Sequence, residues 1–268
     1  YGSGDVEVAQ MLQFQNADYL AVAVSDEGVE LRQAGIRVPV VVMNPEEHSF
    51  QQLIDFGLEP NIYGLDILQR FKKAVAKNGL QHFPIHLKID TGMNRLGFKT
   101  DEEVNHVISE LAAGDLLKVK SVFTHLAASD DPGSNDFTEH QIERFDALAK
   151  KLTRAFPGKI DRHVLNSAGI ERFPGKQYEM VRLGIGLYGV SATGLPLENI
   201  STFKSTISQV KKVMPGETVG YGRRGKIYRE SKIAVVPVGY ADGLDRKLGN
   251  GNGQAWVKGK RVPIVGDI

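Results

Sequence analysis

Cysteine is absent from the sequence, which excludes a disulfide framework and a thiolate metal site. No apolar run approaches the roughly 18 residues that a membrane-spanning helix requires, and no signal peptide is recognisable at the start. The formal net charge is only +1, so the charge balance gives no reason to expect a nucleic acid or a membrane surface as partner. We therefore expect a cytoplasmic protein.

The 268 residues have a composition typical of a globular enzyme, with 41% hydrophobic and 24% charged side chains. From Ala17 onward, strand-like runs alternate with helical patterns. The strand-like runs span residues 17–25, 38–44, 60–64, 83–90, 119–127, 162–168 and 180–189. Such an alternation predicts parallel strands joined by right-handed crossovers.

These runs give one strand fewer than the eight of a (β/α)8 barrel, and a helical pattern over residues 5–17 precedes the first of them. We therefore predict an α/β fold, a (β/α)8 TIM barrel over residues 1–192, whose first strand precedes Tyr1. A doubly wound open sheet is the competing architecture, but no Gly-rich fingerprint follows a first strand.

The pattern changes near Val190, where a loop-rich stretch over residues 191–200 follows the last of these strands. Further strands are expected over residues 201–213, 217–222, 232–241, 254–260 and 261–266. A hairpin turn is expected at Lys258-Gly259-Lys260. We predict a smaller, mostly antiparallel β domain over residues 193–268, and we expect it to be incomplete.

Two neighbouring strand ends carry small residues and a hydroxyl group. One strand ends in Asn166-Ser167-Ala168-Gly169 and the next in Gly184-Ile185-Gly186. A hydroxyl and free backbone N–H groups suit a phosphate monoester, and the phosphate site of a (β/α)8 barrel commonly follows the seventh and eighth strands. We predict that a phosphorylated small molecule binds here.

Lys88 and Asp90 end another strand, and because they are two residues apart they share one of its faces. A lysine that faces into an apolar barrel must be paired, neutral or chemically altered. The alternative is an ion pair with Asp90 that only supports the barrel. Arg95, in the segment TGMNRLG, either meets an anionic ligand or is an exposed loop arginine.

Histidines occupy two further strand ends, at His125 and His163. Each is a candidate acid, base or hydrogen-bonding group at a site, and the simpler interpretation is a hydrogen-bonded core histidine. No HxH or HExxH spacing occurs, so no metal site is predicted.

Arg182 interrupts an otherwise apolar run. A buried arginine stays protonated, since its pKa exceeds about 12. If it faced a pyridine-type nitrogen it would donate a hydrogen bond and leave that nitrogen unprotonated, whereas most pyridoxal phosphate enzymes place an acid there. This arrangement suits reversible proton exchange at Cα. The alternative is a structural arginine paired with a carbonyl or carboxylate.

Several segments, in this order, resemble the alanine racemase family, whose members combine a pyridoxal phosphate-binding barrel with a C-terminal β domain. They are the opening YGSG, HLKIDTGMNRLGF, FTHLAASD, RHVLNSAGIERFP, MVRLGIGLYG, VGYGRRG and PVGYADG. The resemblance covers nearly the whole chain. It implies a pyridoxal 5'-phosphate-dependent isomerase that interconverts L- and D-alanine by a two-base mechanism and supplies D-alanine for peptidoglycan of the cell wall.

The resemblance also implies how the cofactor is held. A Schiff-base lysine would precede Tyr1, and a chain without it is expected to be inactive. Arg182 would hold the ring nitrogen, steadied by His163. The residues implied to bind the cofactor are Tyr1, His125, Asn166, Ser167, Arg182, Gly184 and Ile185.

Further roles follow from the same resemblance. Arg95 and Tyr240 would bind or admit the substrate, and Lys88 would be carbamylated. Tyr221 would be the second acid/base, entering the site of the partner in a homodimer and hydrogen-bonding to His125 there. His125 and His163 would thus assist catalysis alongside Tyr221.

Two other functions remain open on the sequence. One is a non-catalytic pyridoxal phosphate-binding homeostasis protein with the same barrel, against which the segments VGYGRRG and PVGYADG argue. The other is a racemase for a different amino acid, such as serine or lysine, which nothing in the sequence excludes. A fold-related decarboxylase would be expected to carry an acid where Arg182 stands.

Overall fold

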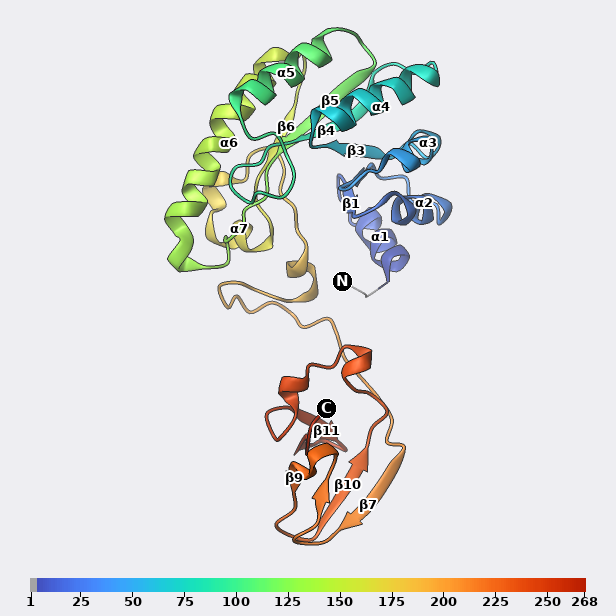
Figure 1. Cartoon of the computed structure of the whole chain (residues 1–268), viewed down its shortest axis with the longest axis vertical. Coiled ribbons are helices and arrows are strands. Elements are labelled where there is room, and N and C mark those ends of the chain that lie inside the picture. Colours follow the sequence, from blue (N-terminus) through green and yellow to red (C-terminus); the bar gives the residue numbers. More distant parts are fainter. Residues whose placement is uncertain (1–3) are drawn as a thin grey trace. The chain divides into compact units, whose positions relative to one another are not determined.

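The computed structural model describes residues 4–268, which fall into two units (Figure 1). The first unit extends to Ile200, and the second spans Ser201–Ile268. The loop-rich stretch over residues 191–200 therefore belongs to the first unit. None of the helices within residues 4–268 has the length and apolar character needed to cross a membrane.

Within residues 4–200, the first unit is built on a parallel sheet of six strands, in which neighbours in sequence are also neighbours in space. The strands are β1 (Leu20–Val22), β2 (Val40–Val42), β3 (Glu59–Ile62), β4 (Phe83–Lys88), β5 (Leu117–Phe123) and β6 (Asp161–His163). This order lacks the reversal of a doubly wound sheet and is the order of a barrel. Within the described residues the sheet is a half-barrel with β1 and β6 at its edges, so the predicted barrel-type fold is confirmed.

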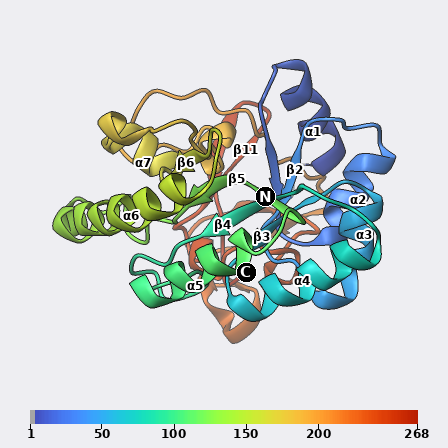
Figure 2. The ribbon, with the colours of Figure 1, turned by 90° about the horizontal axis from the view of Figure 1, so that it is seen from above.

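Helices form a curved layer on one side of this sheet (Figures 1 and 2). They are α1 (Asp5–Phe14), α2 (Ser25–Gln33), α3 (Phe50–Asp55), α4 (Leu65–Lys77), α5 (Asp101–Ala112), α6 (Asn135–Ala155) and α7 (Ser167–Arg172). α4 shows why they pack there, because it buries Leu68, Phe71 and Val75, which recur every three or four residues. The Phe71 ring lies 5.1 Å from that of Phe50 and 5.4 Å from that of Phe83, which links two helices to the sheet.

The other face of the sheet carries polar side chains. In β4, Ile85 and Leu87 belong to the apolar core, so the alternating His86 and Lys88 point to the opposite, inner face. A barrel interior is usually filled by branched apolar side chains. Here buried polar side chains take the place of those apolar ones, which indicates that the chemistry of this fold is located on the inner face.

The strand predicted over residues 180–189 does not form. Met180 and Arg182 donate backbone hydrogen bonds to Arg162 (3.3 Å) and Leu165 (2.9 Å), so the segment runs beside β6. It then enters the short 3-10 helix η4 (Ile185–Tyr188). The ladder stops because the next backbone N–H groups, beginning with that of Gly184, turn to a side-chain oxygen instead.

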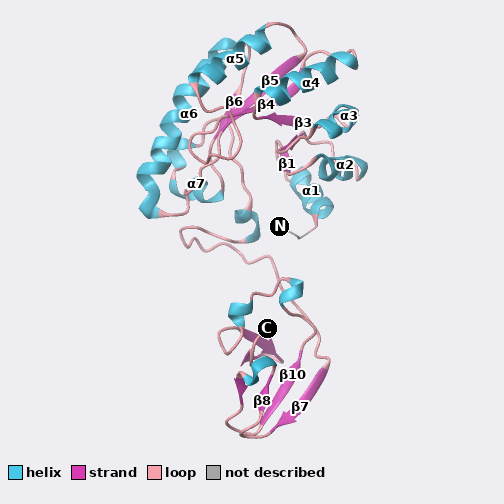
Figure 3. Ribbon diagram, viewed as in Figure 1, coloured by secondary structure: helices cyan, strands magenta, loops and turns pink. Residues whose placement is uncertain are grey.

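The second unit consists of three small antiparallel sheets, of which β7, β8 and β10 are labelled in Figure 3. They pair β7 (Gln209–Val213) with β10 (Ser231–Val235), β8 (Thr218–Val219) with β9 (Gly225–Lys226), and β11 (Gln254–Val257) with β12 (Lys260–Pro263). The predicted hairpin turn is present, since Lys258 and Gly259 have φ angles of 48° and 75°, as a type I′ turn requires. The antiparallel character of this domain is thus as predicted, whereas β9 was not expected.

Candidate active site

Basic side chains converge where β4 and β5 end. Lys88 is the last residue of β4 and only 4% exposed, and His125 follows β5. Burial, followed by the charges of Arg95 and Arg182, lowers the pKa of Lys88 from 10.5 to about 8. Burial and then the neighbouring cations lower the pKa of His125 from 6.5 to about 4. His125 is therefore neutral at pH 7, and the group as a whole favours an anionic ligand.

Asp90 does not form the ion pair with Lys88 that was considered as an alternative. Within residues 4–268, no carboxylate oxygen lies within 4.0 Å of the Lys88 amine. The Asp90 carboxylate instead accepts backbone hydrogen bonds from Gly92 (2.9 Å), Asn94 (3.0 Å) and Arg95 (3.1 Å). It thereby shapes the loop that carries Arg95, whose side chain is exposed at the rim of the site.

Arg182 is held by several acceptors at once. Its Nη1 donates to His163 Nδ1 (2.7 Å) and to the His163 carbonyl (3.1 Å). Its Nη2 donates to the carbonyls of Thr124 (2.7 Å) and Val164 (3.1 Å) and lies 3.5 Å from His125 Nδ1. Burial lowers the pKa of Arg182 to about 10, so the guanidinium remains charged at pH 7.

The ring of Phe123, at the end of β5, packs against the basic side chains of the site. The His163 ring stacks on it with a centroid distance of 4.7 Å and an interplanar angle of 9°. The Arg182 guanidinium lies 5.3 Å from the same centroid, and the Lys88 amine 5.7 Å. Both cations gain cation–π stabilisation from this ring, which partly offsets their desolvation.

The two strand ends predicted to hold a phosphate come together. Ser167, the first residue of α7, is 7% exposed, and its Oγ accepts N–H groups from Gly184 (3.0 Å) and Gly186 (3.1 Å). Ile185, between them, begins η4, where a helix leaves N–H groups free. We call Ser167 Oγ and the backbone N–H groups of residues 184–186 the phosphate cradle. A Cβ on Gly186 would lie 3.4 Å from Ser167 Oγ and would fill part of this cradle.

Asn166 links this cradle to the loop after β5. Its Oδ1 accepts the N–H of Gly169 (2.9 Å), which caps α7, and the hydroxyl of Ser129 (2.7 Å). Its amide group is thus engaged by the protein and fixes where Ser167 stands.

Three predicted residues lie elsewhere. Tyr1 is outside the described residues. Tyr221 and Tyr240 belong to the second unit, where they are 89% and 65% exposed. The structure therefore brings the remaining predicted residues of the first unit together and leaves these tyrosines on the surface of the second.

Comparison with known proteins matches both units. The model for "Alanine racemase, N-terminal domain" matches residues 1–192, and that for "Alanine racemase, C-terminal domain" matches residues 200–268. Alanine racemase 1 of Bacillus subtilis (strain 168) is 38% identical over 277 residues, which cover 100% of this chain and 69% of that protein.

The chain belongs to the alanine racemase family. Solved structures of alanine racemases agree. That of Clostridium difficile 630 is 34% identical, with a TM-score of 0.88 over 100% of this chain and 70% of that one. The alanine racemase of Bartonella henselae, solved with covalently bound pyridoxal phosphate, is 26% identical, with a TM-score of 0.84 over 100% of this chain and 73% of that one.

Sequence reasoning missed three buried polar residues of this alanine racemase chain, Glu59, His86 and Ser121. They lie on the inner face of β3, β4 and β5 and are 8%, 1% and 1% exposed. A signal for His86 was available, because it lies two residues before Lys88 and so shares its face. Glu59 and Ser121 had no comparable sequence signal.

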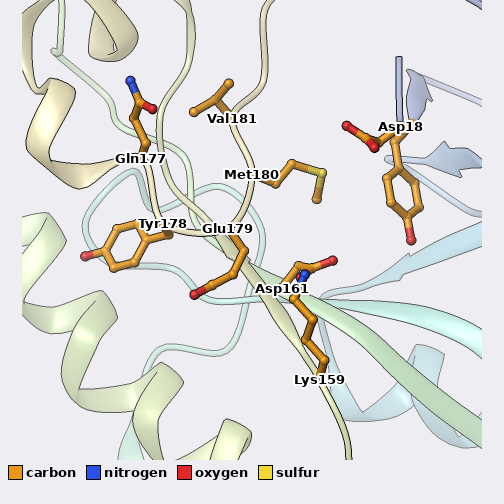
Figure 4. A pocket seen from close by; sticks show the side chains of 9 residues that line it. Asp18, Lys159, Asp161, Gln177, Tyr178, Glu179, Met180 and Val181 are labelled. Atoms are coloured by element: carbon orange, nitrogen blue, oxygen red, sulfur yellow. The ribbon is translucent and has the colours of Figure 1, made fainter. Parts of the chain in front are cut away.

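A cleft of about 350 Å³ lies at the opposite, amino-terminal ends of β1 and β6 (Figure 4). Asp18 lines it on the β1 side, and Asp161 with Lys159 on the β6 side. Barrel enzymes place their chemistry at the carboxyl ends of the strands. We therefore locate the candidate site at the basic group around Arg182 rather than in this cleft.

Proposed function

We propose that the protein interconverts L- and D-alanine with pyridoxal 5'-phosphate by a two-base mechanism, and that its D-alanine serves peptidoglycan synthesis in the cytoplasm. The observation that carries this proposal is the guanidinium of Arg182, held beside neutral His125 and His163 at the ends of the strands. A non-catalytic cofactor carrier would have no use for the second unit's Tyr221.

The residues present fit the phosphate of the cofactor. Ser167 Oγ already accepts two N–H groups, so its own hydrogen can be donated to a phosphate oxygen. The backbone of Gly184 and Ile185 borders the same cradle, and Asn166 fixes it from behind. When bound, pyridoxal phosphate withdraws electrons and acidifies the Cα proton of the amino acid it carries.

Arg182 suits the ring nitrogen. Its two Nη atoms are occupied by acceptors of the protein, and among residues 4–268 no acceptor is found for Nε. Nε–H is thus the donor left for a ring nitrogen. Because the guanidinium keeps its protons at pH 7, the nitrogen it meets stays unprotonated.

We assign proton transfer to a lysine preceding Tyr1 and to Tyr221 of the partner subunit, one on each face of Cα. His125 can donate a hydrogen bond to the oxygen of that tyrosine, because its Nδ1 faces the guanidinium, which only donates, and the neutral ring then carries its proton on Nε2. Arg95 would meet the substrate carboxylate at the rim, and Tyr240 would line the approach.

Lys88 is suited to carbamylation. With its pKa lowered to about 8, a larger fraction of the amine is neutral and nucleophilic at pH 7 than for an exposed lysine. The amine nitrogen would bond to the carbon of CO2 and release one proton, which gives a carbamate anion. This anion would pair with Arg95 and remove a buried cation from the site.

Racemisation of a panel of L-amino acids by the full-length protein that carries the proposed Schiff-base lysine, with cofactor bound, tests the proposed function. We expect alanine to be racemised with the highest kcat/KM. Faster turnover of serine or lysine would identify a racemase for that amino acid, and cofactor binding without racemisation would contradict the proposal in favour of a carrier.

A further inference from the structure

A continuous line of hydrogen-bonded side chains crosses the inner face of the half-barrel, from β3 to Arg182. The linked atoms are Glu59 Oε2 and His86 Nε2 (2.8 Å), His86 Nδ1 and Ser121 Oγ (2.7 Å), Ser121 Oγ and His163 Nε2 (2.9 Å), and His163 Nδ1 and Arg182 Nη1 (2.7 Å). The first four residues are all at most 8% exposed. Four neighbouring strands thus contribute one residue each to a chain that ends on the guanidinium.

The direction of every hydrogen bond in this chain follows from its two ends. A guanidinium can only donate, so His163 Nδ1 accepts and its Nε2 carries the proton. Burial, then the charge of Arg182, holds the pKa of His163 well below its usual value, which keeps the ring neutral. The Nε2–H donates to Ser121, whose hydroxyl then donates to His86 Nδ1. His86 Nε2–H donates in turn to the Glu59 carboxylate, which only accepts.

A β-bulge places the middle of the chain. Ile85 of β4 pairs with Val119 of β5, but the next residue, His86, pairs with Ser121, so Lys120 is an extra residue in β5. Without this shift, Ser121 and Val119 would share a face, and Ser121 could not meet His86. Strand irregularities of this kind re-aim side chains at functional sites.

We propose that Glu59 is a positioning residue for Arg182. Its carboxylate accepts the last hydrogen bond of a chain in which every donor points toward Glu59. It thereby keeps both histidines in the tautomer that lets Arg182 donate to His163. Hydrogen bonds in a buried chain polarise one another, so the carboxylate also strengthens the acceptor that meets the guanidinium. This inference rests on the proposed function, because the chain matters for catalysis only if Arg182 holds the cofactor ring.

Nitrogen-15 NMR of the histidine side chains, recorded on the protein without cofactor, tests the chain directly. We expect His86 and His163 each to be neutral with the proton on Nε2. In Glu59→Leu we expect the His86 signals to change from this pattern to an average of two tautomers. A wild-type His86 that is protonated on Nδ1, or positively charged, would overturn the inference without any variant.

Kinetics with the cofactor bound separate positioning from stability. We expect Glu59→Leu to lower kcat about tenfold with KM changed less than about twofold, in the range found for outer residues that orient a catalytic group. Glu59→Gln keeps an oxygen acceptor and should recover most of this loss. Glu110→Leu is the matched control, because it removes a carboxylate 3.2 Å from Lys72 on the outer helices.

Ser121→Ala breaks the same hydrogen-bonded chain without changing charge. It therefore tests the positioning role even if Glu59→Leu does not fold. It should lower kcat by a similar factor, and where the double variant with Glu59→Leu folds, its kcat should be no lower than that of either single variant. Additive losses, or a loss in Glu59→Leu no larger than in Glu110→Leu, would refute a positioning role. If the wild-type protein does not racemise alanine, it is the proposed function that fails, whatever the NMR spectrum.

Discussion

At the scale of single residues, the site brings several cationic side chains close together, with Lys88 buried and Arg95 exposed at the rim. Burial, and then repulsion from neighbouring cations, lowers the pKa values of Lys88 and His125. An anionic ligand would reduce the repulsion among these cations, which is why a phosphorylated cofactor and an amino acid carboxylate fit the site.

The tyrosine assigned as second base should act on one enantiomer more than on the other. In Tyr221→Phe we expect exchange of the Cα proton to fall about a hundredfold or more for one alanine enantiomer and much less for the other, because each base serves one face. Exchange in deuterium oxide with L- and D-alanine measures this. Tyr228→Phe, an 84% exposed tyrosine of the same unit, is the control; equal mild losses for both enantiomers would contradict the assignment.

The neutral histidines should make the protein less stable in acid. His125 has a folded pKa of about 4 and an unfolded value near 6.5, so the unfolded chain binds more protons between these pH values. The free energy of unfolding should therefore fall as pH falls from about 6.5 to 4, with His163 adding to the effect. Urea denaturation without cofactor should show a shallower fall in His125→Asn, and an unchanged one in the exposed His140→Asn.

Several site residues could be predicted because they stand at strand ends, where a barrel places its chemistry. His163 and Ser167 were predicted in this way, Arg182 was predicted as a charge within an apolar run, and the structure brings the three together. Glu59 and Ser121 were not, because their inward orientation depends on strand register and on the bulge at Lys120. Register arises from the packing of the whole sheet, which a single sequence pattern does not reveal.

At the scale of elements, the loop after β4 is positioned by close backbone contact. Phe98 N–H donates to the Lys88 carbonyl and Asp90 N–H to the Phe98 carbonyl, each at 2.9 Å, so residues 91–97 fold back on the strand. Gly97, with a φ of 130°, makes this possible, because a Cβ there would lie 2.6 Å from the Asp90 nitrogen.

Gly97→Ala should therefore destabilise the protein and displace Arg95. We expect a loss of about 2–3 kcal/mol in the free energy of unfolding, from an unfavourable φ together with a backbone clash. Gly35→Ala is the control, since Gly35 has a φ of 86° but nothing within 4 Å of an added Cβ, and it should lose only about 1 kcal/mol. Equal losses in urea denaturation would show that the clash is absent.

The elements themselves were largely predictable from the 2.0 and 3.6 periodicities, but β9 was missed and one strand was predicted wrongly. The apolar run over residues 180–189 predicted a strand, but the N–H groups of Gly184 and Gly186 bond to Ser167 rather than to β6. A phosphate-type cradle thus competes with a strand for the same backbone groups. The hydrophobic pattern cannot distinguish these outcomes.

At the scale of the whole molecule, we propose that two subunits together complete the site. Arg182, His125 and Lys88 belong to the first unit and Tyr221 to the second. We propose a homodimer in which each Tyr221 serves the site of the partner, so that neither subunit is complete alone.

Mixing two inactive variants tests this arrangement. Co-refolded Tyr221→Phe and Arg182→Leu chains should regain up to roughly a quarter of wild-type activity, because half of randomly formed dimers are mixed and each has one intact site. Each variant refolded alone is the control. Absence of any recovery, with dimers present, would mean that each subunit completes its own site.

The most direct test of the account is nitrogen-15 NMR of the protein loaded with pyridoxal phosphate labelled at the ring nitrogen. We predict the chemical shift of an unprotonated nitrogen that accepts a hydrogen bond from Arg182, and a shift toward the protonated value in Arg182→Glu. A protonated ring nitrogen in the wild-type protein at pH 7 would contradict the account.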